Sequence, residues 1–282
     1  MSLEQVSVNR SFGGRQLKFR HHSRTLACDM VFSVYLPPQA AYDKVPLVYW
    51  LSGLTCSDDN FVQKAGAQQY AAEAGVAIVC PDTSPRGEGV PDDENQAYDF
   101  GLGAGFYVNA TQAPWSQHYH MYDYVTKELP AVLKASDLPV DVKTCSIMGH
   151  SMGGHGALTI ALKNPGVYKA VSAFSPICSP INAPWGHKAL GSYIGSNKAD
   201  WAQYDACALI GRAKEKLHIL VDQGQDDNFL VEQLKPELLQ QACLAAKHPL
   251  TLRLHAGYDH SYFFIASFIG EHIAHHAEAL WA

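Results

Sequence analysis

Short, nearly continuous apolar runs recur along the chain, and they constrain its fold more than any other feature. Each run ends in glycine, proline or a polar residue, and the runs cover residues 46–53, 76–82, 144–150, 168–176, 217–224 and 250–257. Runs of this length are typical of strands that are buried on both faces, as in a parallel sheet. The sequence therefore predicts a sheet whose central strands are parallel.

Segments with the pattern of helices separate these runs. They cover residues 61–74, 121–135, 152–163, 230–246 and 262–280. Strands that alternate with helices predict α/β architecture with right-handed crossovers. Two earlier segments, 16–23 and 30–37, have the composition of strands and follow a turn at Gly13-Gly14. We therefore expect a mostly parallel central sheet flanked by helices, with N-terminal antiparallel strands, in one domain over residues 1–282.

Composition and charge exclude several classes of protein. Of the 282 residues, 47% are hydrophobic and 17% charged, as in an ordinary folded protein. The net charge is -6, and no run of lysine or arginine offers a surface for nucleic acid. The N-terminus lacks the pattern of a secretory signal, and no apolar stretch is long enough to span a membrane. Neither a nucleic-acid partner nor a membrane is expected.

The seven cysteines are scattered and form no CxxC pair. This spacing argues against a zinc ribbon and against a thioredoxin-like redox site. Lone cysteines on apolar strands are usually small buried side chains. The expected compartment is therefore a reducing one, the cytoplasm.

Several strands end in residues that are suited to chemistry. Gly53, Asp82, Ser151, the pair Asp226-Asp227 and His260 all follow predicted strands. In α/β sheets the ligand binds at the carboxyl ends of the parallel strands. We therefore expect a site at this edge.

Ser151 lies in the stretch GHSMG, between a predicted strand and a predicted helix. This is the nucleophile-elbow pattern, in which a strained turn exposes the serine hydroxyl and the next helix begins beside it. The backbone N–H of Met152 would then face a developing oxyanion. A serine that only caps the helix is the alternative. The strand before it and the helix after it favour the nucleophile.

The base that activates Ser151 is expected elsewhere in the sequence. His150 should point to another side of the turn, and His155 has no obvious acid to orient it. In elbow hydrolases the order along the chain is serine, acid, histidine, which favours His260, with His255 as the second choice. The spacing of His272, His275 and His276 could suit a metal, but a solvated C-terminal helix is the preferred interpretation.

The acid should follow the predicted strand at 217–224. Asp222 lies at the end of that strand, whereas Asp226 and Asp227 lie in the loop after it. Neighbouring loop residues rarely point the same way, so only one of the pair should reach His260. Spacing alone leaves this choice open. The other aspartate would cap a helix or face solvent.

A second oxyanion donor is expected in the loop after the strand at 46–53. The backbone N–H of Leu54 fits this position. Cys56, two residues on, could line the pocket or be a buried packing thiol. Trp185 could form a pocket wall or belong to the core.

Longer segments resemble the S-formylglutathione hydrolase family, also called esterase D. They include SGLTCSDDNF, PDTSPRG, DFGLGAGFYVNAT, GHSMGGHGAL, SPICSP, PWGHKAL, DQGQDDNFL and GYDHSYFFIASFI, and together they extend over nearly the whole chain. The resemblance implies an α/β-hydrolase fold with Ser151, Asp227 and His260 as the catalytic triad. It also implies that Leu54 and Met152 are the oxyanion donors. Under this resemblance the acid is Asp227 rather than Asp226.

The resemblance further implies a cytoplasmic thioesterase that hydrolyses S-formylglutathione to formate and glutathione, a step in formaldehyde detoxification. No metal or organic cofactor is implied. Many members are dimers, so a homodimer is one option for this chain. The residues that hold glutathione are not identified by sequence, although Lys64 and Arg86 lie near the expected site.

Four other functions remain open from the sequence. The triad could serve a general carboxylesterase for small acyl esters, or an acyltransferase. The fold could also serve as a binding protein without catalysis, or the histidines could serve a metal-dependent hydrolase.

Overall fold

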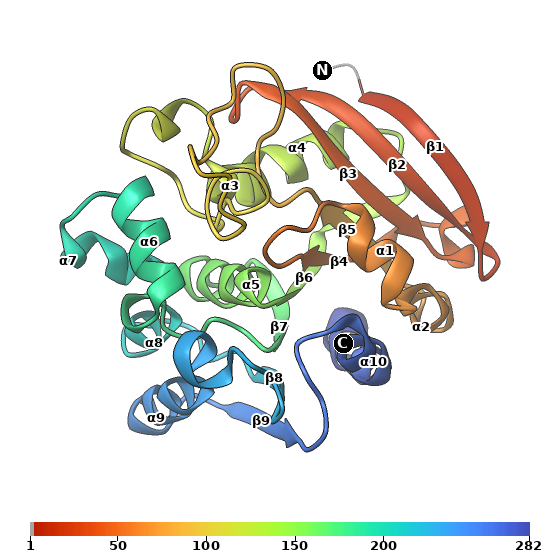
Figure 1. Ribbon diagram of the computed structural model, residues 1–282. Helices are drawn as coiled ribbons and strands as arrows, with labels where there is room; N and C mark the ends of the chain where they lie inside the picture. The colour runs from red at the N-terminus through yellow and green to blue at the C-terminus, as the bar shows by residue number, and fades with distance from the viewer. Residues whose placement is uncertain (1–2) are drawn as a thin grey trace.

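A computed structural model describes residues 3–282 (Figure 1). One nine-stranded sheet forms its centre, in the order β1-β2-β3-β5-β4-β6-β7-β8-β9. The strands are β1 Leu3–Ser11, β2 Gly14–Ser23, β3 Cys28–Leu36, β4 Val45–Leu51, β5 Ala77–Pro81, β6 Val140–His150, β7 Tyr168–Phe174, β8 Ile219–Gly224 and β9 Leu250–His255.

Strand direction divides the sheet into two parts. The pairs β1–β2, β2–β3 and β3–β5 are antiparallel. From β5 through β4 and β6 to β9, every neighbouring pair is parallel. This confirms the predicted α/β-hydrolase arrangement, with a mostly parallel sheet and antiparallel strands at the N-terminus.

Strand β4 shows why the central runs are apolar without interruption. All seven of its residues are buried. Successive side chains of a strand point to opposite faces of the sheet. Leu47 and Tyr49 pack into the hydrophobic cluster on one face, whereas Val48 and Trp50 pack into the cluster on the other. Both faces are therefore covered, and neither tolerates a polar position.

Helices form a layer on each face of the sheet (Figure 1). One layer contains α1 Asp59–Lys64, α2 Ala67–Ala74 and α10 Tyr262–Trp281, whose buried residues share a cluster with Val48 and Trp50. Residues of the remaining helices pack in the cluster that contains Leu47. These helices are α3 Met121–Asp123, α4 Leu129–Ala135, α5 Met152–Lys163, α6 Pro184–Tyr193, α7 Lys198–Trp201, α8 Ala206–Ile210 and α9 Pro236–Ala246.

Some predicted helices are divided in the structure. The predicted helix 61–74 becomes α1 and α2, and 230–246 becomes a π-helical turn at Leu230–Leu234 followed by α9. Lys235, in the left-handed conformation, separates these two elements. Helix α6 was not predicted, because its sequence PWGHKALGSY contains two glycines and a proline. The tertiary packing of Trp185 and Leu190 overrides this weak propensity.

The prediction that the C-terminal histidines are solvated is wrong. His272 and His276 are fully buried on the inner face of α10. Nδ1 of His272 and Nε2 of His276 each lie 2.8 Å from Oγ of Ser172, and Nε2 of His272 lies 3.2 Å from Asp222. Polar side chains can be buried where such partners exist. Burial lowers the pKa of both histidines, so they are neutral at physiological pH.

Within residues 3–282, no helix combines the length and the apolar character needed to cross a membrane.

Candidate active site

The carboxyl ends of the central strands surround an open cavity of about 340 Å³. Ser151 and His260, the predicted nucleophile and base, line it, as does Cys56, a possible pocket residue. Leu54 and Trp185 line it as well. The volume of this cavity is within the range of pockets that bind small molecules. Its other lining residues are Gly53, Thr55, Asn60, Lys64, Tyr98, His150, Phe229 and Tyr262.

Ser151 sits on the turn between β6 and α5 in a strained conformation. Its φ and ψ are 57° and -118°, a region that residues other than glycine rarely adopt. A Cβ atom on Gly153 would lie 1.9 Å from the carbonyl oxygen of Leu51. Only glycine therefore allows α5 to approach β4 so closely. This packing holds the serine on a sharp turn, as the elbow pattern predicts.

His260 lies in the loop after β9, and it contacts a buried carboxylate from the loop after β8. Its Nδ1 atom is 2.5 Å from Oδ2 of Asp227. Because an ionised carboxylate can only accept, Nδ1–H donates and Nε2 is left free. Gln223 Nε2 and the backbone N–H of Phe229 also donate to Asp227. The carboxylate is therefore fixed, and it fixes the tautomer of His260.

The other acid candidates do not contact His260. Asp226 is exposed, as expected for the member of the pair that does not face the histidine. Asp222 is buried and forms an ion pair with Arg253, with oxygen–nitrogen distances of 2.6 Å. His255, the second candidate base, lies 3.2 Å from Asp222 and does not line the cavity. Asp222 and His255 thus belong to a structural cluster that includes His272.

The two histidines that flank Ser151 have different positions. His155 is buried, and its Nε2–H donates to the carbonyl of Phe106. The prediction for His150 is wrong, because its side chain lines the cavity and its ring centroid lies 4.4 Å from that of His260. Burial and the neighbouring His260 lower the pKa of His150 well below its ordinary value. His150 is therefore neutral, and its ring supports one side of His260.

The loop after β4 approaches the serine closely. A Cβ atom on Gly53 would lie 3.0 Å from Cβ of Ser151. Among residues 3–282, the backbone N–H groups of Leu54 and Met152 have no protein acceptor. Met152 is the first residue of α5, where N–H groups are free and the helix dipole is positive. Both donors are thus available for a ligand oxygen.

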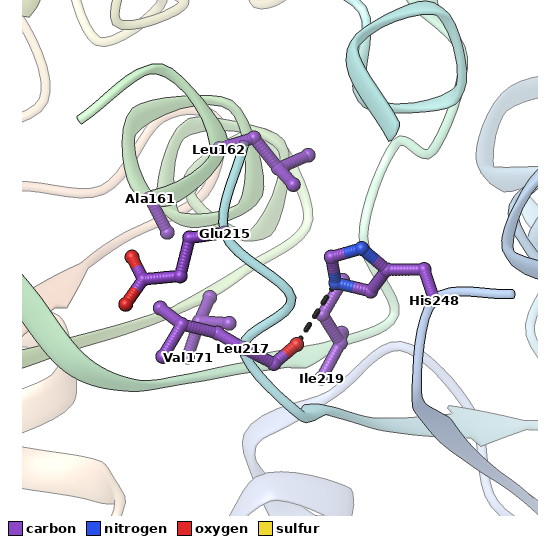
Figure 2. Close-up of a pocket in the computed structure, with 7 residues that line it drawn as sticks. All are labelled: Ala161, Leu162, Val171, Glu215, Leu217, Ile219 and His248. Carbon is purple, nitrogen blue, oxygen red and sulfur yellow. Dashed lines mark hydrogen bonds between the residues drawn. The ribbon is translucent and has the colours of Figure 1, made fainter. Parts of the chain in front are cut away.

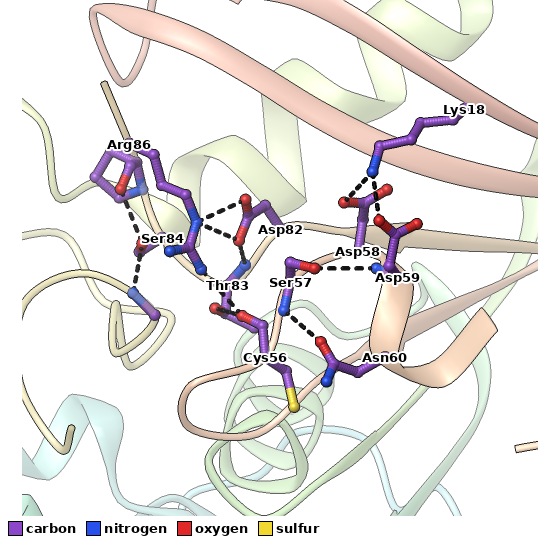
Figure 3. A network of polar contacts seen from close by, with 12 residues as sticks. Lys18, Cys56, Ser57, Asp58, Asp59, Asn60, Asp82, Thr83, Ser84 and Arg86 are labelled. Atoms are coloured by element: carbon purple, nitrogen blue, oxygen red, sulfur yellow. Dashed lines mark hydrogen bonds and ion pairs between the residues drawn. The ribbon is translucent and has the colours of Figure 1, made fainter. Parts of the chain in front are cut away.

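Polar contacts hold this loop in place (Figure 3). Thr55, at φ 66°, is strained, and its N–H donates to the carbonyl of Gly103. The carbonyl of Cys56 accepts from Thr83 Oγ1 at 2.5 Å and from Arg86 Nη2 at 3.2 Å. Arg86 Nε in turn donates to the buried carboxylate of Asp82. The residues of the PDTSPRG segment therefore fix the position of Leu54.

Cys56 and Trp185 both line the cavity, so each reaches the position suggested by the sequence. Trp185 is also only 5% exposed and packs on Phe229, which makes it core and cavity wall at once. Cys56 is partly exposed. Burial is the main reason why the pKa of its thiol is raised.

We expect alkylation of Cys56 by iodoacetamide to inactivate the protein slowly at neutral pH and faster as the pH rises. The thiolate is the reactive form, and a raised pKa makes it scarce at neutral pH. The measurement is the rate of activity loss against pH. Cys56→Ser should resist, whereas Cys207→Ser, which alters the other partly exposed cysteine, should behave as the unmodified protein. Equal inactivation of Cys56→Ser would place the sensitive group elsewhere.

Sequence reasoning did not identify several residues of the cavity wall, including Asn60, Tyr98, Phe229 and Tyr262. Phe229 and Tyr262 each lie two residues after a predicted triad member. That proximity was the available signal for them. Tyr98 comes from a loop without regular structure, and nothing in the sequence connects it to the site.

A second hollow lies near the start of β8, between β7 and the end of α5 (Figure 2). His248 Nε2 contacts the carbonyl of Leu217 there, at 2.8 Å. The volume of this hollow is about 10 Å³, which admits no more than one water molecule. Within the described part of the chain, no cluster of three histidine, cysteine or acidic side chains could hold a metal ion.

Comparison with known proteins identifies similar chains over nearly the full length. The family model "Putative esterase" matches residues 23–275. S-formylglutathione hydrolase of Mus musculus is 54% identical over 282 residues, with 99% of each chain covered. That of Arabidopsis thaliana is 53% identical over 280 residues, with 99% of this chain and 98% of the relative covered.

A solved structure is also similar. The structure of an S-formylglutathione hydrolase from Agrobacterium tumefaciens superimposes with a TM-score of 0.95 and 48% identity. The superposition covers 98% of this chain and 99% of the other. The similarity in fold therefore includes nearly all of the strands and helices described above.

Proposed function

The chain belongs to the S-formylglutathione hydrolase family, and from this premise we propose that it hydrolyses S-formylglutathione through Ser151, His260 and Asp227. The products are formate and glutathione. The observation that supports this proposal best is the pairing of His260 with Asp227 in the cavity that Ser151 lines. The protein is accordingly a hydrolase.

In the first half of the reaction, Nε2 of His260 takes the proton of the Ser151 hydroxyl. The serine oxygen attacks the formyl carbon, and the negative charge moves onto the formyl oxygen. The N–H groups of Leu54 and Met152 stabilise that oxyanion. The C–S bond then breaks, and the sulfur of glutathione leaves with the proton from His260.

In the second half, water attacks the formyl ester of Ser151. His260 takes a proton from this water and returns it to the serine oxygen as formic acid leaves, which ionises to formate in solution. A thiolate is a better leaving group than an alkoxide, so the first half places little demand on His260 as an acid. Asp227 holds the imidazole and stabilises its protonated form.

The contacts of Arg86 give this proposal a test at a distance from Ser151. We expect Arg86→Gln to lower kcat by about tenfold or more, because misplacement of a reacting group by a fraction of an ångström is costly. KM should change less, since Arg86 does not line the cavity. The measurements are kcat, KM and the thermal midpoint Tm.

Lys18→Gln is the matched control, because Lys18 pairs with Asp58 and Asp59 in the neighbouring cluster (Figure 3). That variant should keep its kcat. A folded Arg86→Gln protein with unchanged kcat would show that the contact with Cys56 does not position the loop.

Product analysis tests the proposed reaction itself. Proton NMR of S-formylglutathione with purified protein should show formate and glutathione appearing in equal amounts. Transfer of the formyl group to an added alcohol, without formate, would favour the acyltransferase alternative.

We further propose that the protein acts in the cytoplasm and that its reaction is a step in formaldehyde detoxification. All seven cysteines are free thiols, in agreement with a reducing compartment. A homodimer remains an expectation from the family resemblance, and sedimentation velocity tests it.

A further inference from the structure

The wall of the active-site cavity carries positive charge, although the chain as a whole is acidic. The net charge of the chain is -6. Among the residues that line the cavity, none is aspartate or glutamate, and Lys64 is the one lysine or arginine. Unbalanced charge of one sign in a cleft attracts ligands of the other sign. The cavity is therefore suited to a substrate that carries carboxylates.

Asn60 lies one helical turn before Lys64 on α1, so the two side chains share a face of the helix. Oδ1 of Asn60 accepts the backbone N–H of Ser57 at 2.9 Å (Figure 3). This contact fixes the amide oxygen on the loop. Among residues 3–282, the amide nitrogen donates to no acceptor, and Asn60 lines the cavity. Its N–H₂ group is thus a fixed donor one helical turn from Lys64.

The acidic residues next to Asn60 do not neutralise Lys64. Asp58 and Asp59 lie 3.2 Å and 2.6 Å from Nζ of Lys18, and Figure 3 shows the three side chains grouped together. Within the described residues, Lys64 forms no salt bridge. Its ammonium lies 5.7 Å from the centre of the Tyr262 ring, which also lines the cavity. Lys64 is therefore an uncompensated charge at the cavity wall.

We propose that Asn60 and Lys64 form the subsite that binds a carboxylate of the glutathionyl part of the substrate. This inference rests on the proposed function. An ammonium and an amide donor on one face of a helix can each donate to one oxygen of a carboxylate, and such hydrogen bonds are stronger than neutral ones. The subsite would hold the peptide while the formyl group reaches Ser151.

The test compares a charged thioester with a neutral ester on the same variants. We expect Lys64→Gln to lower the ratio of kcat/KM for S-formylglutathione to kcat/KM for p-nitrophenyl acetate about tenfold, the effect of one hydrogen bond to a charged group. Asn60→Ala should lower the ratio in the same direction, and Lys64→Arg should restore most of it. Lys134→Gln, which removes the same charge from an exposed position on α4 outside the cavity, should keep the ratio of the unmodified protein.

Glutathione has two carboxylates, and modified substrates tell them apart. The C-terminal amide of S-formylglutathione lacks the glycine carboxylate, and the analogue with 4-aminobutanoyl in place of γ-glutamyl lacks the glutamyl one. Lys64→Gln should have little further effect on the thioester that lacks the bound carboxylate. If Lys64→Gln lowers kcat/KM for one of these substrates and not for the other, the subsite binds the carboxylate that only the first substrate carries.

Failure of this inference is distinct from failure of the proposed function. An unmodified protein that does not hydrolyse S-formylglutathione would overturn the function itself. If it does hydrolyse the thioester, an unchanged ratio in Lys64→Gln and Asn60→Ala would overturn the subsite. Equal losses on the thioester and the acetate would overturn it as well, because they would indicate damage to the site in general.

Discussion

Replacement of Ser151 by alanine should lower the turnover of S-formylglutathione by about 10⁶-fold, the scale found when the serine nucleophile of a serine protease is removed. The variant lacks the oxygen that forms the acyl intermediate. His260 and the backbone donors remain, and they account for any residual rate. The measurement is single-substrate kinetics at saturating thioester.

Two controls separate lost chemistry from lost structure. Ser267→Ala removes an exposed hydroxyl on α10 and should keep full activity. A fluorophosphonate probe should label the unmodified protein and Ser267→Ala but not Ser151→Ala. Turnover close to that of the unmodified protein in Ser151→Ala would contradict the nucleophile. Absence of labelling in a folded unmodified protein would instead favour a binding protein without catalysis.

The second large effect is expected at the acid. Asp227→Asn should lower kcat by about 10⁴-fold, as for the equivalent change in a serine protease. An asparagine amide can donate to Nδ1 of His260 and thus stabilise the tautomer that leaves Nε2–H facing the serine. That tautomer cannot take the serine proton. The amide also fails to stabilise the imidazolium that forms.

Asp226→Asn is the matched control for this variant. Asp226 is adjacent in sequence and carries the same charge, but its side chain is exposed. Its replacement should change kcat by less than about twofold, as for most surface substitutions. Thermal unfolding of both variants shows whether each is folded at the assay temperature. The reverse order of effects would mean that Asp226 serves as the acid.

The sheet and the elbow could be predicted from the sequence because local patterns determine both. The apolar runs at 46–53 and 144–150 become β4 and β6, because burial on both faces of the sheet requires an uninterrupted apolar run that is visible in the sequence. The spacing of Gly149, Ser151 and Gly153 was also readable, because the close backbone packing around the serine requires glycine at the first and last of these positions. Helix α6 was missed because its stability comes from tertiary packing and not from propensity.

The histidines show the limit of pattern reading. His272 and His276 look like the solvated face of a helix, yet Ser172 and Asp222 on neighbouring strands make their burial favourable. His150 was expected to point to another side of the turn, but the loop after β9 brings His260 against its ring. In both cases the decisive partner lies on an element far away in sequence. No local pattern records such a partner.

The choice between Asp226 and Asp227 could not be made from spacing, since both follow β8 in one loop. Geometry separates them, because only Asp227 is buried and accepts from His260, Gln223 and Phe229. For a similar reason the sequence did not identify Asn60 as a wall residue, and it placed Lys64 only near the expected site. Their side chains are ordinary surface types, and they become distinctive only beside a cavity without acidic groups.

The most direct measurement is the kcat/KM of the purified protein for S-formylglutathione beside that for p-nitrophenyl acetate, followed by thioester absorbance and by released nitrophenolate. The proposed function predicts a clear preference for the thioester, lost in Ser151→Ala. Ser151-dependent hydrolysis of the acetate, with no hydrolysis of S-formylglutathione above the rate without protein, would contradict it.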